Sequence, residues 1–210
     1  GALVQGVALA RARRRPAQQL GQHACPRIHC MSSLRPSGLG WQTVWPALAG
    51  AAQAASIAWP GSGQALGWLQ VLSLTLLAAG LARLAHASFS RGREAHPLKR
   101  AAWFGGVFAT AWLAGSFWWL YVSMHQVGGL PAPLAVLAVL ALAAALALYY
   151  AAASAVWVGL ARGLVADRPG WASALFAAVW TLAELMRGRW LTGFPWGAGG
   201  YAHVDGTLAA

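Results

Sequence analysis

Glu184 and Arg187 are the residues whose types and spacing could do chemistry. They lie three positions apart, so on a helix they share one face. They follow a long apolar segment, and charged groups at membrane depth usually mark a functional site. One interpretation is an ion pair that locks two helices together, with Arg187 reaching outward. The other is a polar site for a lipid headgroup or a reacting carbonyl, where Arg187 attracts a phosphate; the two stay open.

An aromatic turn follows this charged pair, in the run Gly193-Phe194-Pro195-Trp196. Pro195 lacks a backbone donor and Gly193 permits unusual dihedral angles, so a helix cannot continue easily. Irregular backbone at membrane depth is tolerated only inside protein or beside a cavity. The alternative is an aromatic anchor just outside the bilayer. The candidates for a lipid or substrate access site are therefore Glu184, Arg187, Thr192, Phe194, Pro195 and Trp196.

A second aromatic group ends an earlier apolar segment. Trp118, Tyr121 and His125 are spaced so that they share a helix face. An aromatic belt at the membrane surface is the default interpretation. His125 could also carry a proton, although a single His at a helix end is more often a structural hydrogen-bonding group. All three residues join the access-site candidates.

The sequence offers no catalytic set. Its four carboxylates are Glu94, Asp167, Glu184 and Asp205, and its only lysine is Lys99. Nucleophilic catalysis needs a nucleophile beside a base, and we identify no such pair. The cluster of His23, Cys25, His29 and Cys30 lacks a recognised zinc spacing. We therefore expect no catalytic residue in this chain, no metal site and no cofactor.

The positioning elements are predicted to be membrane helices. The chain is 59% hydrophobic and only 9% charged, whereas soluble proteins carry about 25% charged residues. We predict an all-α, polytopic bundle with five spans, a re-entrant or interfacial turn and the start of a sixth span. The predicted spans are residues 41–59, 64–82, 101–124, 134–160 and 171–187, within a membrane domain of residues 36–210.

Charge placement predicts the orientation. Of the 15 basic residues, six lie between Arg11 and Arg35 and five between Arg83 and Arg100. Basic residues in alternate loops orient a membrane protein with those loops in the cytoplasm, so we expect a cytoplasmic N-terminus. The same pattern makes topology a better explanation of the net charge of +11 than nucleic-acid binding. Arg187 and Arg189 alone fall on the external side.

Residues 1–35 are predicted to be a separate, basic and disordered tail. Their composition is Arg-rich and irregular, and the first methionine is Met31. A short apolar run precedes the basic cluster, the reverse of the order in a signal peptide. Translation upstream of a start at Met31 is the alternative.

The segment Phe117–Pro131 resembles the exit of the third helix in bacterial apolipoprotein N-acyltransferases. The run from Glu184 to Trp196, followed by Tyr201 and Asp205, resembles that family's most recognisable membrane motif. The resemblance implies a multi-pass bacterial inner-membrane enzyme with eight spans and a periplasmic domain like that of carbon–nitrogen hydrolases. Its partners would be the lipid bilayer, a phospholipid acyl donor and a diacylglyceryl lipoprotein acceptor.

In that family the acyl chain passes through a thioester on a cysteine, assisted by a Glu and a Lys in the periplasmic domain. No position of this chain matches that triad, so the resemblance implies the membrane portion of the enzyme. The rival interpretations are a secondary transporter and a non-catalytic scaffold subunit. Transporters place broken helices in paired halves, and the irregular segment at Gly193 has no counterpart here.

Overall fold

A computed structural model describes residues 39–91, 96–190 and 193–204 of the chain. Every regular element among these residues is a helix, as the sequence predicts. The helices are α2 (Leu39–Ile57), α3 (Gly67–Arg91), α4 (Pro97–Ser116), α5 (Trp118–Val122), the π-helix η1 (Ser123–Val127), α6 (Ala132–Ala161), α7 (Leu164–Asp167), α8 (Pro169–Arg189) and the 3₁₀-helix η2 (Gly199–His203). The predicted basic tail and its His23–Cys30 cluster lie outside the described residues.

The helix boundaries differ from the predicted ones chiefly at the basic loop. We expected residues 83–100 to form a loop, but α3 continues to Arg91 and α4 begins at Pro97. An α-helix satisfies its own backbone hydrogen bonds, and Arg is a good helix former, so these helices extend beyond their apolar parts. The break after η1 falls between the predicted spans 101–124 and 134–160, at Gly129, which has a φ of 67°.

Among the described residues, two helices are long and apolar enough to cross a membrane: residues 67–87 of α3 and the whole of α6. A third candidate is the pair formed by α4 and the α5–η1 segment, which bend by 52° at Phe117. Five spans are therefore not established by length and composition. The remaining two predicted spans correspond to α2, which contains Gln42 and Gln53, and to α8, which contains the charges at 184, 187 and 189.

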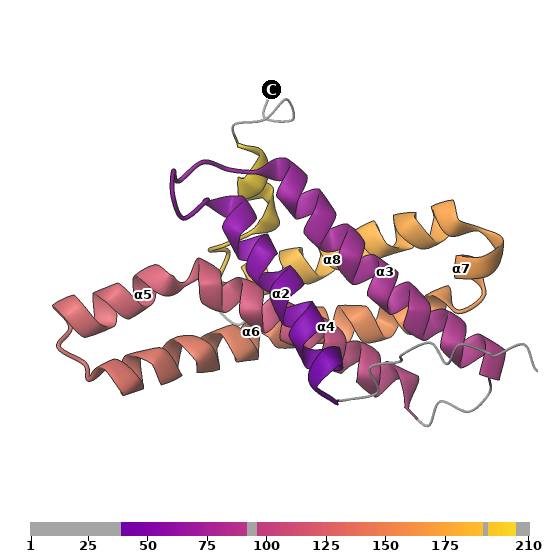
Figure 1. Ribbon diagram of the computed structural model, residues 1–210, viewed down its shortest axis with the longest axis horizontal. Helices are drawn as coiled ribbons and strands as arrows, with labels where there is room; N and C mark the ends of the chain where they lie inside the picture. Colours follow the sequence, from indigo (N-terminus) through magenta and orange to yellow (C-terminus); the bar gives the residue numbers. More distant parts are fainter. Residues whose placement is uncertain (1–38, 92–95, 191–192, 205–210) are drawn as a thin grey trace, which may run out of the picture. The chain divides into compact units, whose positions relative to one another are not determined.

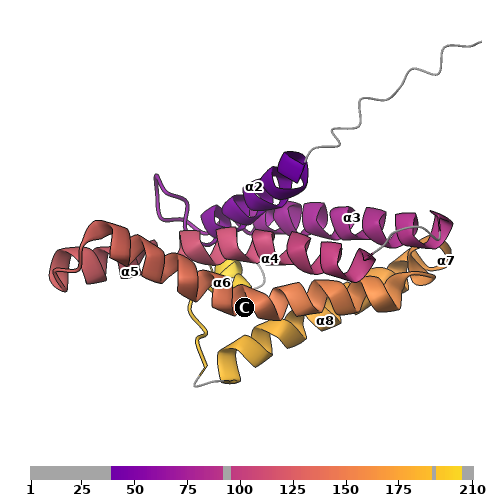
Figure 2. The same cartoon turned by 90° about the horizontal axis from the view of Figure 1, so that it is seen from below.

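The long helices pack around α4. It contacts α6 most extensively and α2 next, while α6 also packs against α8 (Figures 1 and 2). Small residues make the α4–α6 approach close: a Cβ added to Gly105 would lie 2.7 Å from Cβ of Ser154 and 3.0 Å from the Tyr150 carbonyl oxygen. Such contacts are typical of membrane helices, whose interfaces favour small side chains.

Large apolar side chains cover much of the outer surface. On α6 alone Leu137, Leu140, Leu148 and Leu160 are exposed. Soluble monomers rarely expose contiguous apolar patches of this kind. The fold is that of a membrane protein, and it places the C-terminal end of α8 near the start of α3, where Gln70 and Glu184 line one hollow.

Candidate functional site

Arg187 is buried at the end of α8, with only 1% of its surface exposed. Its Nε donates a hydrogen bond to the Tyr150 hydroxyl over 2.9 Å. Its Nη1 donates to the carbonyl oxygens of Phe194, at 2.6 Å, and Trp196, at 2.9 Å. Arginine suits this role because its planar fork donates in several fixed directions. Arg187 therefore ties the aromatic turn to α6.

Glu184 is linked to Arg187 through Tyr150 rather than by a direct salt bridge. The Tyr150 hydroxyl donates to Oε1 of Glu184 over 3.4 Å. The backbone N–H of Gly199 donates to both carboxylate oxygens, at 3.2 and 3.3 Å. Each charge thus has hydrogen-bonding partners, as charges in a low-dielectric interior require.

The aromatic turn, residues 193–196, follows the end of α8 and packs against the junction of α4 and α5. Gly193 has a φ of 70°, a left-handed conformation that glycine adopts without steric cost. The N–H of Phe194 then donates to the Arg187 carbonyl, so the chain folds back on the helix. Phe194 packs edge-on against Phe117, and Trp196 against Trp119, with centroids 5.1 and 5.8 Å apart. Thr192 lies outside the described residues, and Pro195 is exposed.

The 3₁₀-helix η2 closes the site from the side of α3. Gln70 of α3 donates from Nε2 to the Gly199 carbonyl over 2.8 Å. A Cβ at Gly199 would lie 2.6 Å from that nitrogen and 3.4 Å from Oε1 of Glu184. Only glycine lets the backbone of η2 approach Gln70 and Glu184 this closely.

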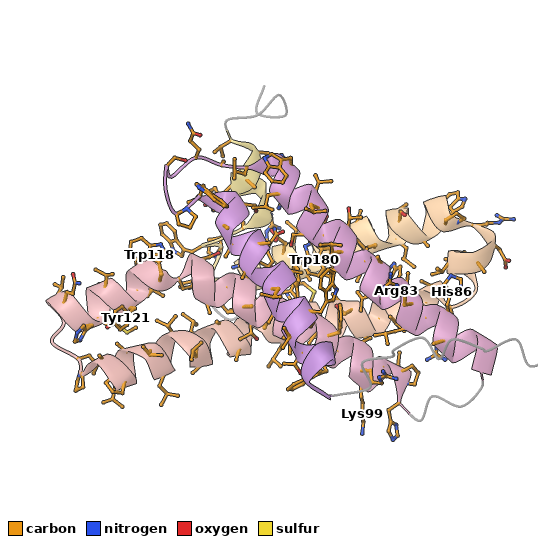
Figure 3. All side chains as sticks on the ribbon, in the orientation of Figure 1. Arg83, His86, Lys99, Trp118, Tyr121 and Trp180 are labelled. Carbon is orange, nitrogen blue, oxygen red and sulfur yellow. The ribbon has the colours of Figure 1, made fainter. Side chains whose placement is uncertain are left out.

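A cleft lies between α3 and α8, next to these hydrogen bonds. Its polar end has a volume of about 290 Å³ and is lined by residues that include Gln70, Thr181, Glu184 and His203. It continues into an apolar part of about 600 Å³, and the two parts share Val71, Leu74, Trp180 and Thr181. Trp180 lies in the middle of the bundle (Figure 3). A cleft with one polar and one apolar end suits an amphipathic molecule.

The other aromatic candidates lie farther along the bent α4–α5 pair. Trp118 is 66% exposed, and it lies with Tyr121 at one end of the molecule (Figure 3). Tyr121 and His125 have ring centroids 5.4 Å apart, and Nδ1 of His125 lies 2.8 Å from the Leu130 carbonyl oxygen. This contact agrees with the structural interpretation of His125. The structure does not bring these three side chains to the aromatic turn.

Four residues of the site were not predicted from the sequence. They are Tyr150 on α6, Gln70 on α3, Gly199 in η2 and the Trp119 that meets the turn. A polar side chain within an apolar helix was the available signal for Gln70 and Tyr150. Nothing in the sequence indicated which helix each of them would face.

Comparison with known proteins identifies the family. The model of the apolipoprotein N-acyltransferase N-terminal domain matches residues 51–210. The chain belongs to the apolipoprotein N-acyltransferase family. It is 56% identical over 170 residues to the apolipoprotein N-acyltransferase from Verminephrobacter eiseniae. This alignment covers 81% of this chain and 30% of the relative.

Two further relatives of the same name agree with this assignment. The protein from Ralstonia nicotianae is 48% identical over 68% of this chain, and that from Pseudomonas putida is 41% identical over 67%. Each alignment covers 25% of the relative. The chain thus spans less than a third of the length of these relatives. The aromatic turn, Glu184 and Arg187 lie within the part that the family model matches.

Proposed function

We propose that this chain is the membrane portion of an enzyme that moves an acyl chain from a phospholipid to lipoproteins. The acceptor is the α-amino group of the N-terminal diacylglyceryl-cysteine, and the reaction passes through a cysteine thioester formed outside this chain. The observation that carries the proposal is the family match over residues 51–210.

We further propose that the chain lies in the bacterial inner membrane with five spans and a cytoplasmic N-terminus. The gathering of basic residues at 83–100 supports that orientation through the positive-inside rule. The external end of α8 then faces the periplasmic side, where the acceptor would be met. Reporter fusions at residues 92–95 test this: activity of a periplasmic reporter there would contradict the orientation.

The cleft between α3 and α8 is the proposed access route for the donor lipid. Glu184 and Thr181 stand at its polar end, and the apolar part offers room for an acyl chain. Arg187 acts by holding the aromatic turn, because its guanidinium is engaged by Tyr150, Phe194 and Trp196. Phe194 and Trp196 extend this wall toward Phe117 and Trp119.

A pair of adjacent substitutions in the full-length protein tests the access route. Thr181→Trp fills the cleft, whereas Leu182→Trp adds the same bulk at a residue that is 55% exposed and is not among those lining the cleft. We expect Thr181→Trp to lower acyl transfer at least about tenfold in a lipoprotein mobility-shift assay, because blocked positioning costs that much or more. Equal activity of the two variants would reject the cleft as the route.

A further inference from the structure

A second groove lies on the outer side of α4, between α2 and α6. It has a volume of about 690 Å³, and most of its lining is apolar. Small residues make its floor, among them Ala102, Gly106, Ala144 and Ala151. Trp103, Leu140 and Leu148 stand beside them and are 59%, 46% and 67% exposed. The groove is therefore a long hollow between bulky side chains on a surface that faces lipid.

The groove is long enough to hold an acyl chain of one leaflet. On α4 its lining runs from Lys99 to Ala114, which corresponds to roughly 22 Å of helix. One leaflet supplies about half of a hydrocarbon core that is ~30 Å thick. The hydroxyl of Thr110, a polar group in the lining, already donates to the Gly106 carbonyl. The interior of the groove therefore suits an apolar ligand.

Lys99 lies at one end of the groove, and two further basic residues line a hollow beside it. This smaller hollow, of about 180 Å³, shares Trp103 with the groove and is lined by Arg83 and Arg100. Arg100 also makes another interaction, whereas Arg83 and Lys99 are exposed. No acidic residue is among the described residues that line either hollow. The local charge is therefore positive and complements an anion.

This basic end is far from the aromatic candidates. Arg83 and Lys99 lie toward one end of the helices, and Trp118 and Tyr121 toward the other (Figure 3). The groove and the α3–α8 cleft have no lining residue in common. What binds here is thus separate from the proposed donor route.

We propose that this groove binds an anionic glycerophospholipid of the cytoplasmic leaflet, the leaflet being fixed by the orientation proposed above. One acyl chain lies along Ala102, Gly106 and Ala144, and the phosphate meets Lys99 at the end of the groove. Arg83, in the adjoining hollow, adds positive charge to this end. Basic pockets between membrane helices on the cytoplasmic side are typical sites for acidic lipid headgroups. The bound lipid is a stable partner of the helices and is not the acyl donor.

Lipid titration of the delipidated full-length protein, followed by native mass spectrometry, tests the proposal. The probes are phosphatidylglycerol and phosphatidylcholine with the same acyl chains. We expect phosphatidylglycerol to bind more tightly than phosphatidylcholine. Lys99→Gln should weaken its binding by about fivefold, the contribution of one basic residue beside acidic lipid, and Arg83→Gln, in the adjoining hollow, should weaken it by less. Arg168→Gln is the matched control, since Arg168 is exposed and lines neither hollow; its affinity should stay unchanged.

Two adjacent alanines test the groove itself. Ala144→Phe fills it, while Ala145→Phe places the same ring on an exposed residue that does not line it. We expect only Ala144→Phe to abolish the tight phosphatidylglycerol site. Any one of three outcomes would overturn the proposal. The first is equal affinity for the two lipids, and the second is an equal effect of Lys99→Gln and Arg168→Gln on phosphatidylglycerol binding. The third is an equal effect of the two Phe variants.

Two further outcomes separate this inference from its rivals. A photo-crosslinker at position 144 should capture phospholipid, and capture of another helix of the full-length protein would overturn the proposal. If Ala144→Phe fails to fold, the charge variants decide, because they leave the packing unchanged. Acyl transfer is measured in parallel: lost lipid binding with intact transfer supports this site independently of the proposed reaction.

Discussion

The loss of Arg187 should release the aromatic turn and destabilise the protein. Arg187→Ala removes three hydrogen bonds, one to the Tyr150 hydroxyl and two to the carbonyl oxygens of the turn. It also leaves Glu184 without the nearby positive charge. The side chain is 1% exposed, so water does not readily replace these contacts.

The magnitude follows from those lost contacts. Side-chain hydrogen bonds in membrane proteins contribute about 0.6 kcal/mol each on average, so three of them give about 2 kcal/mol. Glu184 also loses the nearest positive charge, and the cost of breaking a directly paired, buried ion pair, about 3–5 kcal/mol, is the upper limit for that loss. We therefore expect the free energy of unfolding to fall by about 2–5 kcal/mol. The stability of Arg187→Lys should lie between that of Arg187→Ala and that of the parent protein, because one ammonium group cannot reproduce the planar, several-donor guanidinium of Arg187.

Thermal unfolding of the detergent-solubilised protein measures this effect. At about 2 °C or more per kcal/mol for a protein of this size, Arg187→Ala should lower the melting temperature by at least about 4 °C. Arg189→Ala is the control, since Arg189 is exposed on the same last turn of α8, and surface changes are usually worth less than about 0.5 kcal/mol. Hydrogen exchange should locate the loss: the amides of Phe194 and Gly199 should exchange faster. Equal melting temperatures of the two variants would refute the reasoning.

Two further substitutions test the same network from its other sides. Tyr150→Phe removes the hydroxyl between Arg187 and Glu184 and should lower the free energy of unfolding by about 1–3 kcal/mol. Tyr149→Phe, at a partly buried neighbour, should lower it by less than half as much in the same thermal assay. The reverse order would contradict the assigned bridge. Gly197→Ala should lower the free energy of unfolding by at least about 1–2 kcal/mol, because Gly197 has a φ of 70° and an added Cβ would lie 2.9 Å from Cβ of Ser116. Gly200→Ala should be close to neutral, since an added Cβ there would have no atom within 4 Å. Equal effects of the two variants would exclude this packing.

The helices were predictable because each has a local cause. Apolar runs of membrane-spanning length, separated by Gly and Pro, indicated α3 and α6 directly. The turn between the first two predicted spans, 41–59 and 64–82, contains Gly63, and the break between the predicted spans 101–124 and 134–160 contains Gly129; both glycines have a positive φ, which glycine adopts without steric cost. The ends of α3 and α4 were missed because charged residues form helix as readily as they form loops outside a membrane.

The site was predictable only in part because its contacts depend on how the helices cross. Glu184 and Arg187 could be predicted from their charge within an apolar segment, and the aromatic turn from its glycine and proline. Tyr150 did not, because nothing in the apolar run of α6 says which of its faces meets α8. The bend of 52° beginning at Phe117 likewise turned Phe117 and Trp119, rather than Trp118, toward the turn. A local pattern cannot report a tertiary bend.

The central claim is that this chain serves as the membrane portion of a lipoprotein N-acyltransferase. The most direct test joins the chain to the remaining C-terminal part of the Verminephrobacter eiseniae relative, which is 56% identical over the shared region. The chimaera is expressed in bacteria depleted of their own enzyme, and mass spectrometry reads the N-terminal cysteine of a lipoprotein. We expect an added acyl chain on the α-amino group. A chimaera that inserts into the membrane but leaves that amine free, while the parent enzyme acylates it, would contradict the account.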